Sequence, residues 1–186
     1  AYINGKAVKD FAQNLSTYLG IEHVIPCANG TDALQIAMMA LDLQPGDEVI
    51  TPSFTYIATT EVVALLKLKP VFVDVDPVTY CMDIESLKKA ITPKTKAIVP
   101  VHLYGQAANM NAVMDIAQKH NLFVIEDNAH GLCGSYRGRL LGTFGAMSTL
   151  SFHDTKNFSC GEGGALIIND PALVERAEII REKGTN

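Results

Sequence analysis

The sequence of 186 residues contains no tryptophan and only four cysteines. Cys27, Cys81, Cys133 and Cys160 lie far apart and form no Cys-x-x-Cys pair. This spacing argues against a disulfide framework and against a zinc site. We therefore expect reduced thiols, no metal centre and a cytoplasmic location.

The sequence also lacks an excess of basic residues and a long apolar run. It carries 15 Lys and Arg against 20 Asp and Glu, a formal net charge of −5. No basic stripe is present to neutralise phosphates, so we expect no nucleic-acid partner. No apolar run reaches the roughly 18 residues of a membrane span, and residues 1–6 do not resemble a signal peptide, so we expect no membrane association.

Two common phosphate-binding motifs are missing. The segment Gly161–Leu166 approaches Gly-x-Gly-x-x-Gly, but it has leucine in place of the third glycine and precedes an expected strand rather than a helix. The Gly-x-x-x-x-Gly-Lys-Ser/Thr loop is absent as well. Nicotinamide-dependent Rossmann enzymes and P-loop ATPases are therefore disfavoured.

What the sequence does contain is a regular alternation of short apolar strands and helices. Apolar spacing predicts helices over residues 8–19, 31–43, 59–68, 84–91, 110–120 and 171–183. Short apolar runs predict strands over residues 23–27, 48–51, 70–75, 96–102, 122–126, 149–152 and 165–168. The alternation predicts one α/β domain with three layers, in which helices cover both faces of a mostly parallel sheet.

Ligands of such sheets bind at the carboxyl ends of the strands, and two strand ends carry suggestive segments. Residues 28–33, Ala-Asn-Gly-Thr-Asp-Ala, lead into a helix whose N-terminus could bind an anion, or could simply be capped by Asn29 or Thr31. Residues 52–56, Pro-Ser-Phe-Thr-Tyr, place aromatic rings where a flat cofactor could stack, although core aromatics would look the same.

Two further strand ends carry ionisable groups. An apolar strand delivers Glu126 and Asp127, and His130 follows; the alternative to a site is a capping Asp and a surface His. Lys156 lies between a strand and the glycine-rich residues 161–164, where it is either a nucleophilic amine or an ordinary surface lysine. An amine, a carboxylate, an aromatic plane and an anion-binding helix end together match the needs of pyridoxal phosphate (PLP).

The sequence resembles the DegT/DnrJ/EryC1/StrS family of fold-type-I, PLP-dependent nucleotide-sugar aminotransferases over essentially all 186 residues. The later blocks resemble the branch that aminates dTDP-4-keto-6-deoxyhexoses, and the earlier ones equally resemble the branch that acts on 3-keto sugars. The matching blocks are residues 29–34, 45–49, 52–56, 72–77, 90–98, 102–105, 125–127 and 151–157.

The resemblance implies a role for each of eight residues. Lys156 would form the Schiff base with PLP and move the substrate proton, and Asp127 would pair with the pyridinium nitrogen. His130 would lie near the ring hydroxyl and Tyr56 would stack on the ring. The phosphate would be bound by the remaining four, namely Gly30, Thr31, Asp32 and Ser151.

The resemblance also implies what the whole protein does. It would move an amino group from L-glutamate to a nucleotide-linked keto sugar, in amino-sugar and lipopolysaccharide biosynthesis. Family chains are about twice as long, so residues 1–186 would be the PLP-binding large domain of a homodimer with shared active sites, with the small C-terminal domain missing. Two alternatives remain: another fold-type-I PLP enzyme, and a non-catalytic regulatory member of the family.

Overall fold

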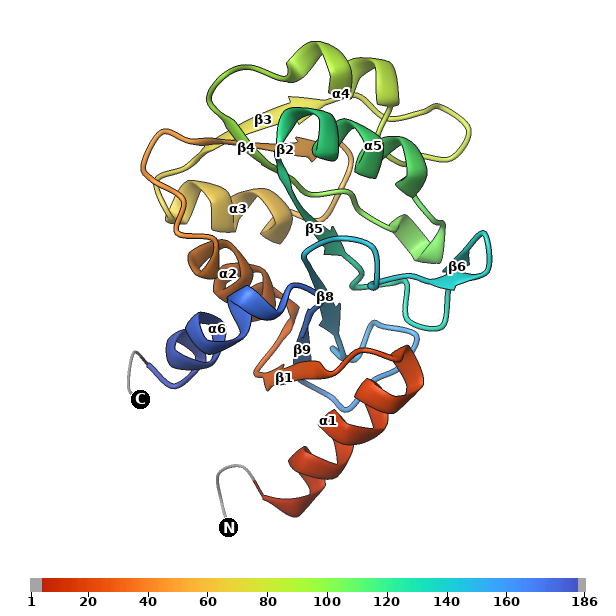
Figure 1. The fold of residues 1–186 in the computed structure, drawn as a ribbon. Coiled ribbons are helices and arrows are strands. Elements are labelled where there is room, and N and C mark those ends of the chain that lie inside the picture. Colours follow the sequence, from red (N-terminus) through yellow and green to blue (C-terminus); the bar gives the residue numbers. More distant parts are fainter. Residues whose placement is uncertain (1–4, 184–186) are drawn as a thin grey trace.

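The computed structural model describes residues 5–183. Its main feature is a seven-stranded sheet in the order β1-β9-β8-β5-β4-β2-β3 (Figure 1). The strands are β1 (His23–Cys27), β2 (Glu48–Pro52), β3 (Lys69–Val73), β4 (Thr95–Ile98), β5 (Phe123–Asp127), β8 (Met147–Ser151) and β9 (Gly164–Ile168). A separate two-stranded hairpin consists of β6 (Ser135–Tyr136) and β7 (Arg139–Leu140).

The sheet is mostly parallel, as the sequence predicted. Strands β3, β2, β4, β5 and β8 pair in parallel with one another in that order. Strand β9 is antiparallel to both of its neighbours, β8 and β1. The parallel strands therefore all end at one edge of the sheet, and this edge collects the side chains discussed below.

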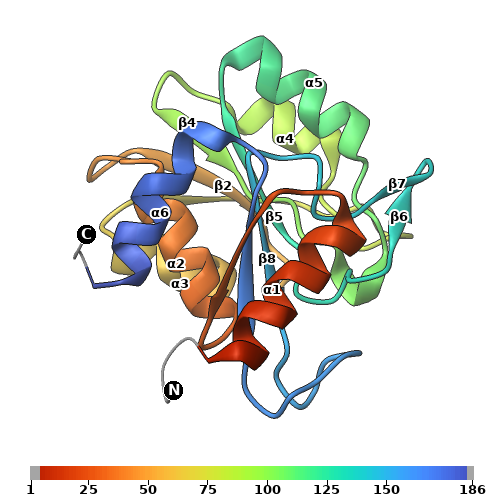
Figure 2. The ribbon, with the colours of Figure 1, turned by 60° about the horizontal axis from the view of Figure 1, so that its bottom comes forward.

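Helices cover both faces and produce the expected three layers (Figure 2). Helices α2 (Gly30–Ala40), α3 (Ala58–Leu65) and α6 (Val174–Arg181) pack with one set of strand side chains into the largest core cluster. On the opposite face lie α1 (Lys6–Leu19), α4 (Ile84–Ala90) and α5 (Met110–His120). Because successive side chains of a strand point to opposite faces, Ile168 belongs to the first cluster and Ile167 to the α1 cluster.

The local sequence explains several helix ends. Helix α1 ends at Gly20, whose φ of 68° is the left-handed conformation that glycine adopts without strain. Helix α2 begins after Asn29, whose side chain accepts a hydrogen bond from the backbone N–H of Asp32 at 2.8 Å. Most of α2 is buried because its residues are apolar on nearly every side.

Some boundaries differ from those predicted. The helix expected over residues 171–183 is divided into a 3₁₀ turn, Pro171–Leu173, and α6. The strand expected over residues 96–102 ends at Ile98, close to Pro100, which has no N–H to donate to a ladder. The hairpin β6–β7 and a 3₁₀ turn at Leu103–Gly105 were not predicted, since neither has an apolar period. Within residues 5–183, no helix combines the length and the apolar character that a membrane crossing needs.

A buried carboxylate joins three strands at their amino-terminal ends, opposite the carboxyl ends described above. The carboxylate of Glu48, at the start of β2, is 4 % exposed and accepts hydrogen bonds from the Thr92 hydroxyl, the Lys69 ammonium at 3.0 Å and the Thr95 hydroxyl at 3.5 Å. The Thr92 hydrogen bond and then the Lys69 hydrogen bond hold the pKa of Glu48 below its ordinary value. Strands β2, β3 and β4 are thereby joined where they begin.

The Glu48→Gln substitution tests this network. A carboxyl group with a lowered pKa in the folded state stabilises the fold above the pKa of the unfolded chain, and this stabilisation is lost as the pH falls through the folded value. We expect Glu48→Gln to lower the free energy of unfolding by about 1–3 kcal/mol at neutral pH. The difference from wild type should shrink below about pH 4.3, the ordinary range of Glu.

Urea unfolding across this pH range measures the effect. The matched control is Glu85→Gln on α4, an exposed carboxylate paired with Lys88 at 2.6 Å, which should change the stability by less than about 0.5 kcal/mol. Equal effects of the two substitutions at neutral pH would contradict the account of Glu48.

Candidate active site

Asp127 is the last residue of β5 and lies at the carboxyl edge of the sheet, 6 % exposed. One carboxylate oxygen accepts a hydrogen bond from the hydroxyl of Thr59, on α3, at 2.7 Å. The other accepts the backbone N–H of Ala129 at 3.3 Å. The Thr59 hydroxyl also pairs with that of Thr55 at 3.1 Å. These two donors, one on α3 and one in the turn after β5, hold the carboxylate in one orientation. Asp127 is followed by a turn and not by a helix, so it is not a helix cap.

Lys156 and His130 meet directly at this edge. The Nζ atom of Lys156 lies 3.0 Å from Nε2 of His130, and both side chains are partly buried. Burial, followed by the positive charge of Lys156, lowers the pKa of His130, while the charge of Asp127 opposes the shift. His130 is therefore a neutral imidazole at neutral pH. The predicted lysine, carboxylate and imidazole belong to one cluster.

Tyr104 completes this cluster and was not among the predicted site residues. Its backbone N–H donates to Nδ1 of His130 at 3.3 Å, and its ring stacks on the imidazole with centroids 5.7 Å apart. The backbone of Tyr104 has a φ of 53°, in the left-handed region that a tyrosine rarely adopts. Gly105 follows with a φ of 83°, and a Cβ there would lie 3.3 Å from the carbonyl oxygen of His130. Strain of this kind clusters at functional sites.

Thr59 and Thr55 were also missed. Their only signal in the sequence is a spacing of four residues that begins within the aromatic segment 52–56, and this spacing is common. The structure explains the spacing. The segment follows β2, whose carboxyl end lies at the same edge as Asp127, and the Thr59 hydroxyl contacts that carboxylate.

The N-terminus of α2 lies against the end of β8. A Cβ added to Gly30, the first residue of α2, would lie 2.9 Å from the Cβ of Ser151. Glycine at this position lets the first turn of α2 lie close to Ser151. The structure identifies Asn29, not Thr31, as the N-cap, and the Asp32 N–H is bonded to it. Gly30 and Ser151 are therefore in close contact, and Thr31 follows in the first turn of α2. The N–H of Asp32 is already occupied by Asn29, which leaves the N–H groups of Gly30 and Thr31 and the Ser151 hydroxyl to suit an anion.

Tyr56 lies in the segment that connects β2 to α3. Its side chain is 70 % exposed, and that of Phe54 is 47 % exposed, so the interpretation of this segment as core aromatics is wrong. Phe54 contacts Tyr80 with ring centroids 5.6 Å apart. The carbonyl of Tyr56 accepts the N–H of Thr59, the partner of Asp127, so Tyr56 and the carboxylate are linked through one short segment.

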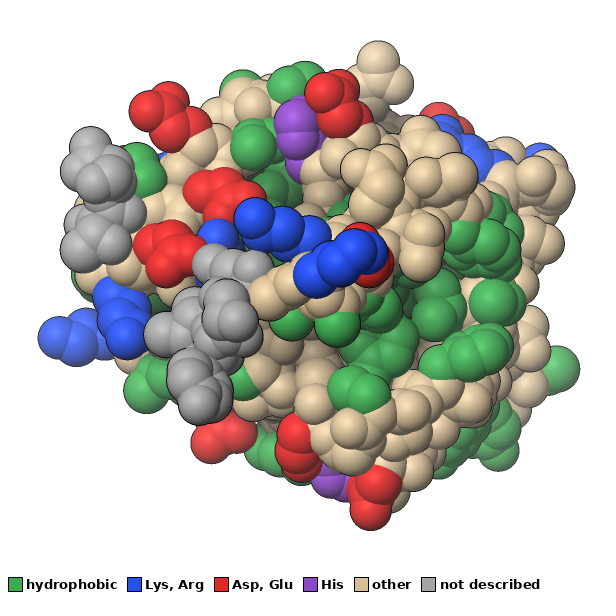
Figure 3. All heavy atoms as spheres, turned by 90° about the horizontal axis from the view of Figure 1, so that it is seen from below, with side chains coloured by type: hydrophobic (Ala, Val, Ile, Leu, Met, Phe, Trp, Pro, Cys, Tyr) green, Lys and Arg blue, Asp and Glu red, His purple; other side chains and the backbone are tan. Residues whose placement is uncertain are grey.

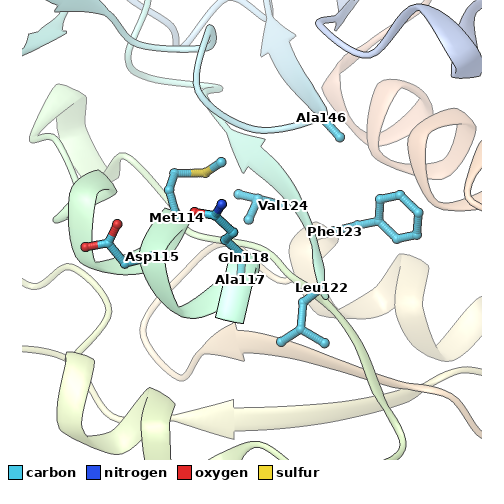
Figure 4. A pocket seen from close by; sticks show the side chains of 8 residues that line it. All are labelled: Met114, Asp115, Ala117, Gln118, Leu122, Phe123, Val124 and Ala146. Carbon is cyan, nitrogen blue, oxygen red and sulfur yellow. The ribbon is translucent and has the colours of Figure 1, made fainter. Parts of the chain in front are cut away.

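Neither of two surface hollows is lined by Lys156, His130 or Asp127. One, of about 320 Å³, lies between α5 and the beginning of β5, and Met114, Val124 and Phe123 give it an apolar lining in which Asp115 is the charged group (Figure 4). This is the opposite end of β5 from Asp127. The hollow therefore has none of the chemistry collected at the carboxyl edge.

The second hollow, of about 460 Å³, lies between α2 and α6 and includes Cys27, Asp32 and Arg181. Burial raises the pKa of the Cys27 thiol to about 12, and the charge of Asp32 adds to the effect. The thiol is therefore protonated and unreactive at neutral pH. Among the residues from 5 to 183, no three His, Cys, Asp or Glu side chains are grouped so as to hold a metal ion.

On the lower face of the molecule, hydrophobic and basic side chains gather in different places. Seen from below, many hydrophobic side chains gather on the right of the view, whereas most of the Lys and Arg side chains in sight lie at its centre and left (Figure 3). Several large apolar side chains at the carboxyl edge are also exposed, among them Tyr56, Ile57 and Tyr104.

The close approach of Gly30 and Ser151 gives a test. Gly30→Ala should destabilise the protein by about 1–3 kcal/mol, although alanine is the better helix former, because its methyl group forces α2 away from β8. Ser151→Gly removes the opposing Cβ. The double variant should therefore be more stable than the sum of the two single changes predicts.

Thermal or urea unfolding of the four proteins measures this coupling. Gly20→Ala is a useful comparison, because a Cβ there meets no atom within 4 Å and the penalty comes only from its φ of 68°. Ser151→Gly should therefore not rescue it. Strict additivity of Gly30→Ala and Ser151→Gly would contradict the packing described here.

Known proteins are similar to this chain over nearly its whole length. A UDP-2-acetamido-2-deoxy-3-oxo-D-glucuronate aminotransferase from Pseudomonas aeruginosa is 48 % identical over 184 residues, which are 98 % of this chain and 51 % of the relative. A pleiotropic regulatory protein from Geobacillus stearothermophilus is 46 % identical over 99 % of this chain and 50 % of its own length. The chain spans about half the length of these relatives.

A solved structure and a family profile agree with these similarities. NtdA from Bacillus subtilis, solved with its bound cofactor PMP, superposes with a TM-score of 0.89 and 40 % identity, covering 95 % of this chain and 40 % of NtdA. The profile of the DegT/DnrJ/EryC1/StrS aminotransferase family matches residues 1–186. With its mixed α/β fold and its lysine, carboxylate and imidazole at one sheet edge, the chain belongs to the DegT/DnrJ/EryC1/StrS aminotransferase family.

Proposed function

We propose that the whole protein is a PLP-dependent aminotransferase that moves an amino group from L-glutamate to a keto group of a nucleotide-linked deoxysugar. The observation that carries the proposal is the cluster of Lys156, His130 and Asp127 at one edge of the sheet. It is supported by the name of the Pseudomonas aeruginosa relative and by the PMP bound to NtdA.

The residues present fit the cofactor. Lys156 offers the amine to which PLP attaches, and when bound PLP supplies an electron sink for the bond changes at the substrate. Asp127, buried and oriented by Thr59, offers the negative charge that keeps a pyridinium nitrogen protonated. The α2 N-terminus and the Ser151 hydroxyl would hold the phosphate, with Gly30 allowing the approach and Thr31 and Asp32 supplying the first turn.

The protein's own groups would also manage the protons. Lys156 would act as the base that takes the proton from the substrate carbon and returns it. His130, kept neutral by its lowered pKa, would accept or donate one hydrogen bond beside the ring hydroxyl without adding a charge. Tyr56 would cover one face of the ring. Its 70 % exposure leaves it free to do so.

The open site suggests what the rest of the protein contributes. Tyr56, Ile57 and Tyr104 are 63–78 % exposed at the carboxyl edge. We expect a second copy of the chain and a smaller C-terminal domain to cover this edge, giving a homodimer with shared sites. The 3-oxo group in the name of the Pseudomonas aeruginosa relative makes a UDP-linked 3-keto sugar the first substrate to test. Its amino sugar product would be used for polysaccharide biosynthesis in the cytoplasm.

A regulatory role is the second candidate, because the Geobacillus stearothermophilus relative is named a pleiotropic regulatory protein. A purely regulatory protein has no chemical need for a lysine and a buried carboxylate at one edge. Cofactor binding and amino transfer therefore discriminate between the two.

Absorption spectroscopy of the full-length protein with PLP provides the first test. We expect a visible band from the lysine-bound cofactor that is lost in Lys156→Ala and bleaches with L-glutamate. Lys119→Ala, in the last turn of α5, is the matched control and should keep the band. A band that persists in Lys156→Ala, or that bleaches only with a different amino donor such as L-glutamine, would contradict the assignment of Lys156 or of the donor, respectively.

The Asp127→Asn substitution tests the role of the buried charge. Asparagine can still accept the hydrogen bond from Thr59, but it removes the negative charge opposite the pyridinium nitrogen. We expect kcat for amino transfer to fall by about 10²–10³-fold while PLP still attaches to Lys156. Asp115→Asn, in the hollow at the other end of β5, should leave kcat unchanged. An unchanged kcat in Asp127→Asn would remove Asp127 from the mechanism.

A further inference from the structure

Glu126 is a second carboxylate at the end of β5, on the opposite side of the strand from Asp127. It is wholly buried and accepts four hydrogen bonds. The backbone N–H groups of Gly142, Phe144 and Gly145 donate to it at 2.9, 2.7 and 2.9 Å. The fourth partner is Nε2 of His102, at 2.9 Å. These donors fill the acceptor sites of a carboxylate, so Glu126 reaches neither solvent nor substrate.

His102 is wholly buried as well, and its hydrogen bonds define its tautomer. Its Nδ1 accepts the backbone N–H of Ala108 at 3.2 Å, so this nitrogen carries a lone pair. The proton of the neutral ring is therefore assigned to Nε2, where it is donated to Glu126. With this tautomer both ring nitrogens of His102 have a partner, and the distances of 2.9 and 3.2 Å fit it.

His102 is linked to the catalytic cluster by its backbone and by its packing. Its N–H donates to the carbonyl of Asp127 at 3.0 Å, and its carbonyl accepts the N–H of Gly105 at 3.1 Å. It thus begins the turn that holds Tyr104 in its left-handed conformation against His130. A Cβ on Gly131 would lie 3.2 Å from the Cβ of His102, so His102 also packs beneath the residue that follows His130.

We propose that Glu126 and His102 are positioning residues that, through the Leu103–Gly105 turn, hold His130 against Lys156. Neither residue touches the cofactor site. Their importance for catalysis depends on the proposed aminotransferase function, whereas their effect on His130 does not. Breaking the pair should free the turn, expose His130 to water and lengthen its contact with Lys156.

Four variants separate positioning from general stability. Glu126→Gln places an amide NH₂ opposite N–H donors in either orientation. His102→Asn keeps an acceptor for the N–H of Ala108, but its amide NH₂ is too short to reach Glu126. The longer side chain in His102→Gln keeps a donor that reaches Glu126. Glu48→Gln is the matched control, because Glu48 is also a buried, hydrogen-bonded carboxylate, with three donors, and it lies at the opposite end of the strands.

The first readout is the titration of His130, followed by NMR of the imidazole groups in the cofactor-free protein. In wild type we expect His130 to titrate below about 6.5, the ordinary histidine value. In Glu126→Gln and His102→Asn its pKa should rise toward that value. In His102→Gln and Glu48→Gln it should stay where it is in wild type. This readout requires neither PLP binding nor activity.

The second readout is the rate at which the full-length protein captures PLP, followed by the visible band. We expect this rate to fall by about 10–100-fold in Glu126→Gln and His102→Asn, because small displacements of a reacting group have effects of this size. His102→Gln should keep most of the wild-type rate. Glu48→Gln should lose stability but not capture rate. The positioning proposal is overturned if Glu126→Gln and His102→Asn shift the His130 titration no more than Glu48→Gln does. Failure of wild type to capture PLP, with the His130 shifts as expected, would overturn the proposed function alone.

Discussion

Two neighbouring carboxylates at the end of one strand determine much of this structure. A buried carboxylate is strongly destabilising unless donors surround it. Glu126 is surrounded by the backbone of residues 142–145 and by His102, and these contacts fix the path of the chain into β8 and out of β4. Asp127 lies on the other side of the strand and faces the open edge, and the contacts of Glu126 restrict its position. The hydrogen bonds that the buried Glu126 carboxylate requires thus also orient the Asp127 carboxylate.

The same strand end connects elements that are distant in the sequence. Through Thr59, Asp127 contacts the beginning of α3, and its backbone bonds to His102. His130 follows three residues later and contacts Lys156, which lies in the loop between β8 and β9. Thr59 follows β2, His102 follows β4, His130 follows β5 and Lys156 follows β8, and each of these connections begins at the carboxyl end of a parallel strand. A site built this way is as rigid as the sheet edge that supports it.

Much of the fold and part of the site follow from the sequence. The alternation of strands and helices predicted the layers and the parallel sheet, because periodicity reports burial directly. Lys156, Asp127 and His130 were predicted together because they follow apolar strands, and the structure brings them into one cluster. The roles assigned to them, and to the phosphate-binding residues, remain predictions. Tyr104 and Thr59 could not be found, because a left-handed turn and a hydroxyl–carboxylate contact depend on tertiary packing and leave no period in the sequence. For the same reason the sequence showed His102 only as a histidine at a strand end.

Strand β1 has a consequence for how the chain folds. It is an edge strand whose only strand neighbour among the described residues is β9, so His23 pairs with Ile168, which is distant in the sequence. Such a distant pairing closes a large loop, which slows folding relative to local contacts. During synthesis, β2, β3, β4 and β5 can assemble as soon as they leave the ribosome, whereas β1 has no strand partner until residues 164–168 have emerged. Strand β1 therefore joins the sheet only after β9 has been synthesised. A ribosome that pauses before β9 would leave this apolar strand exposed to other chains.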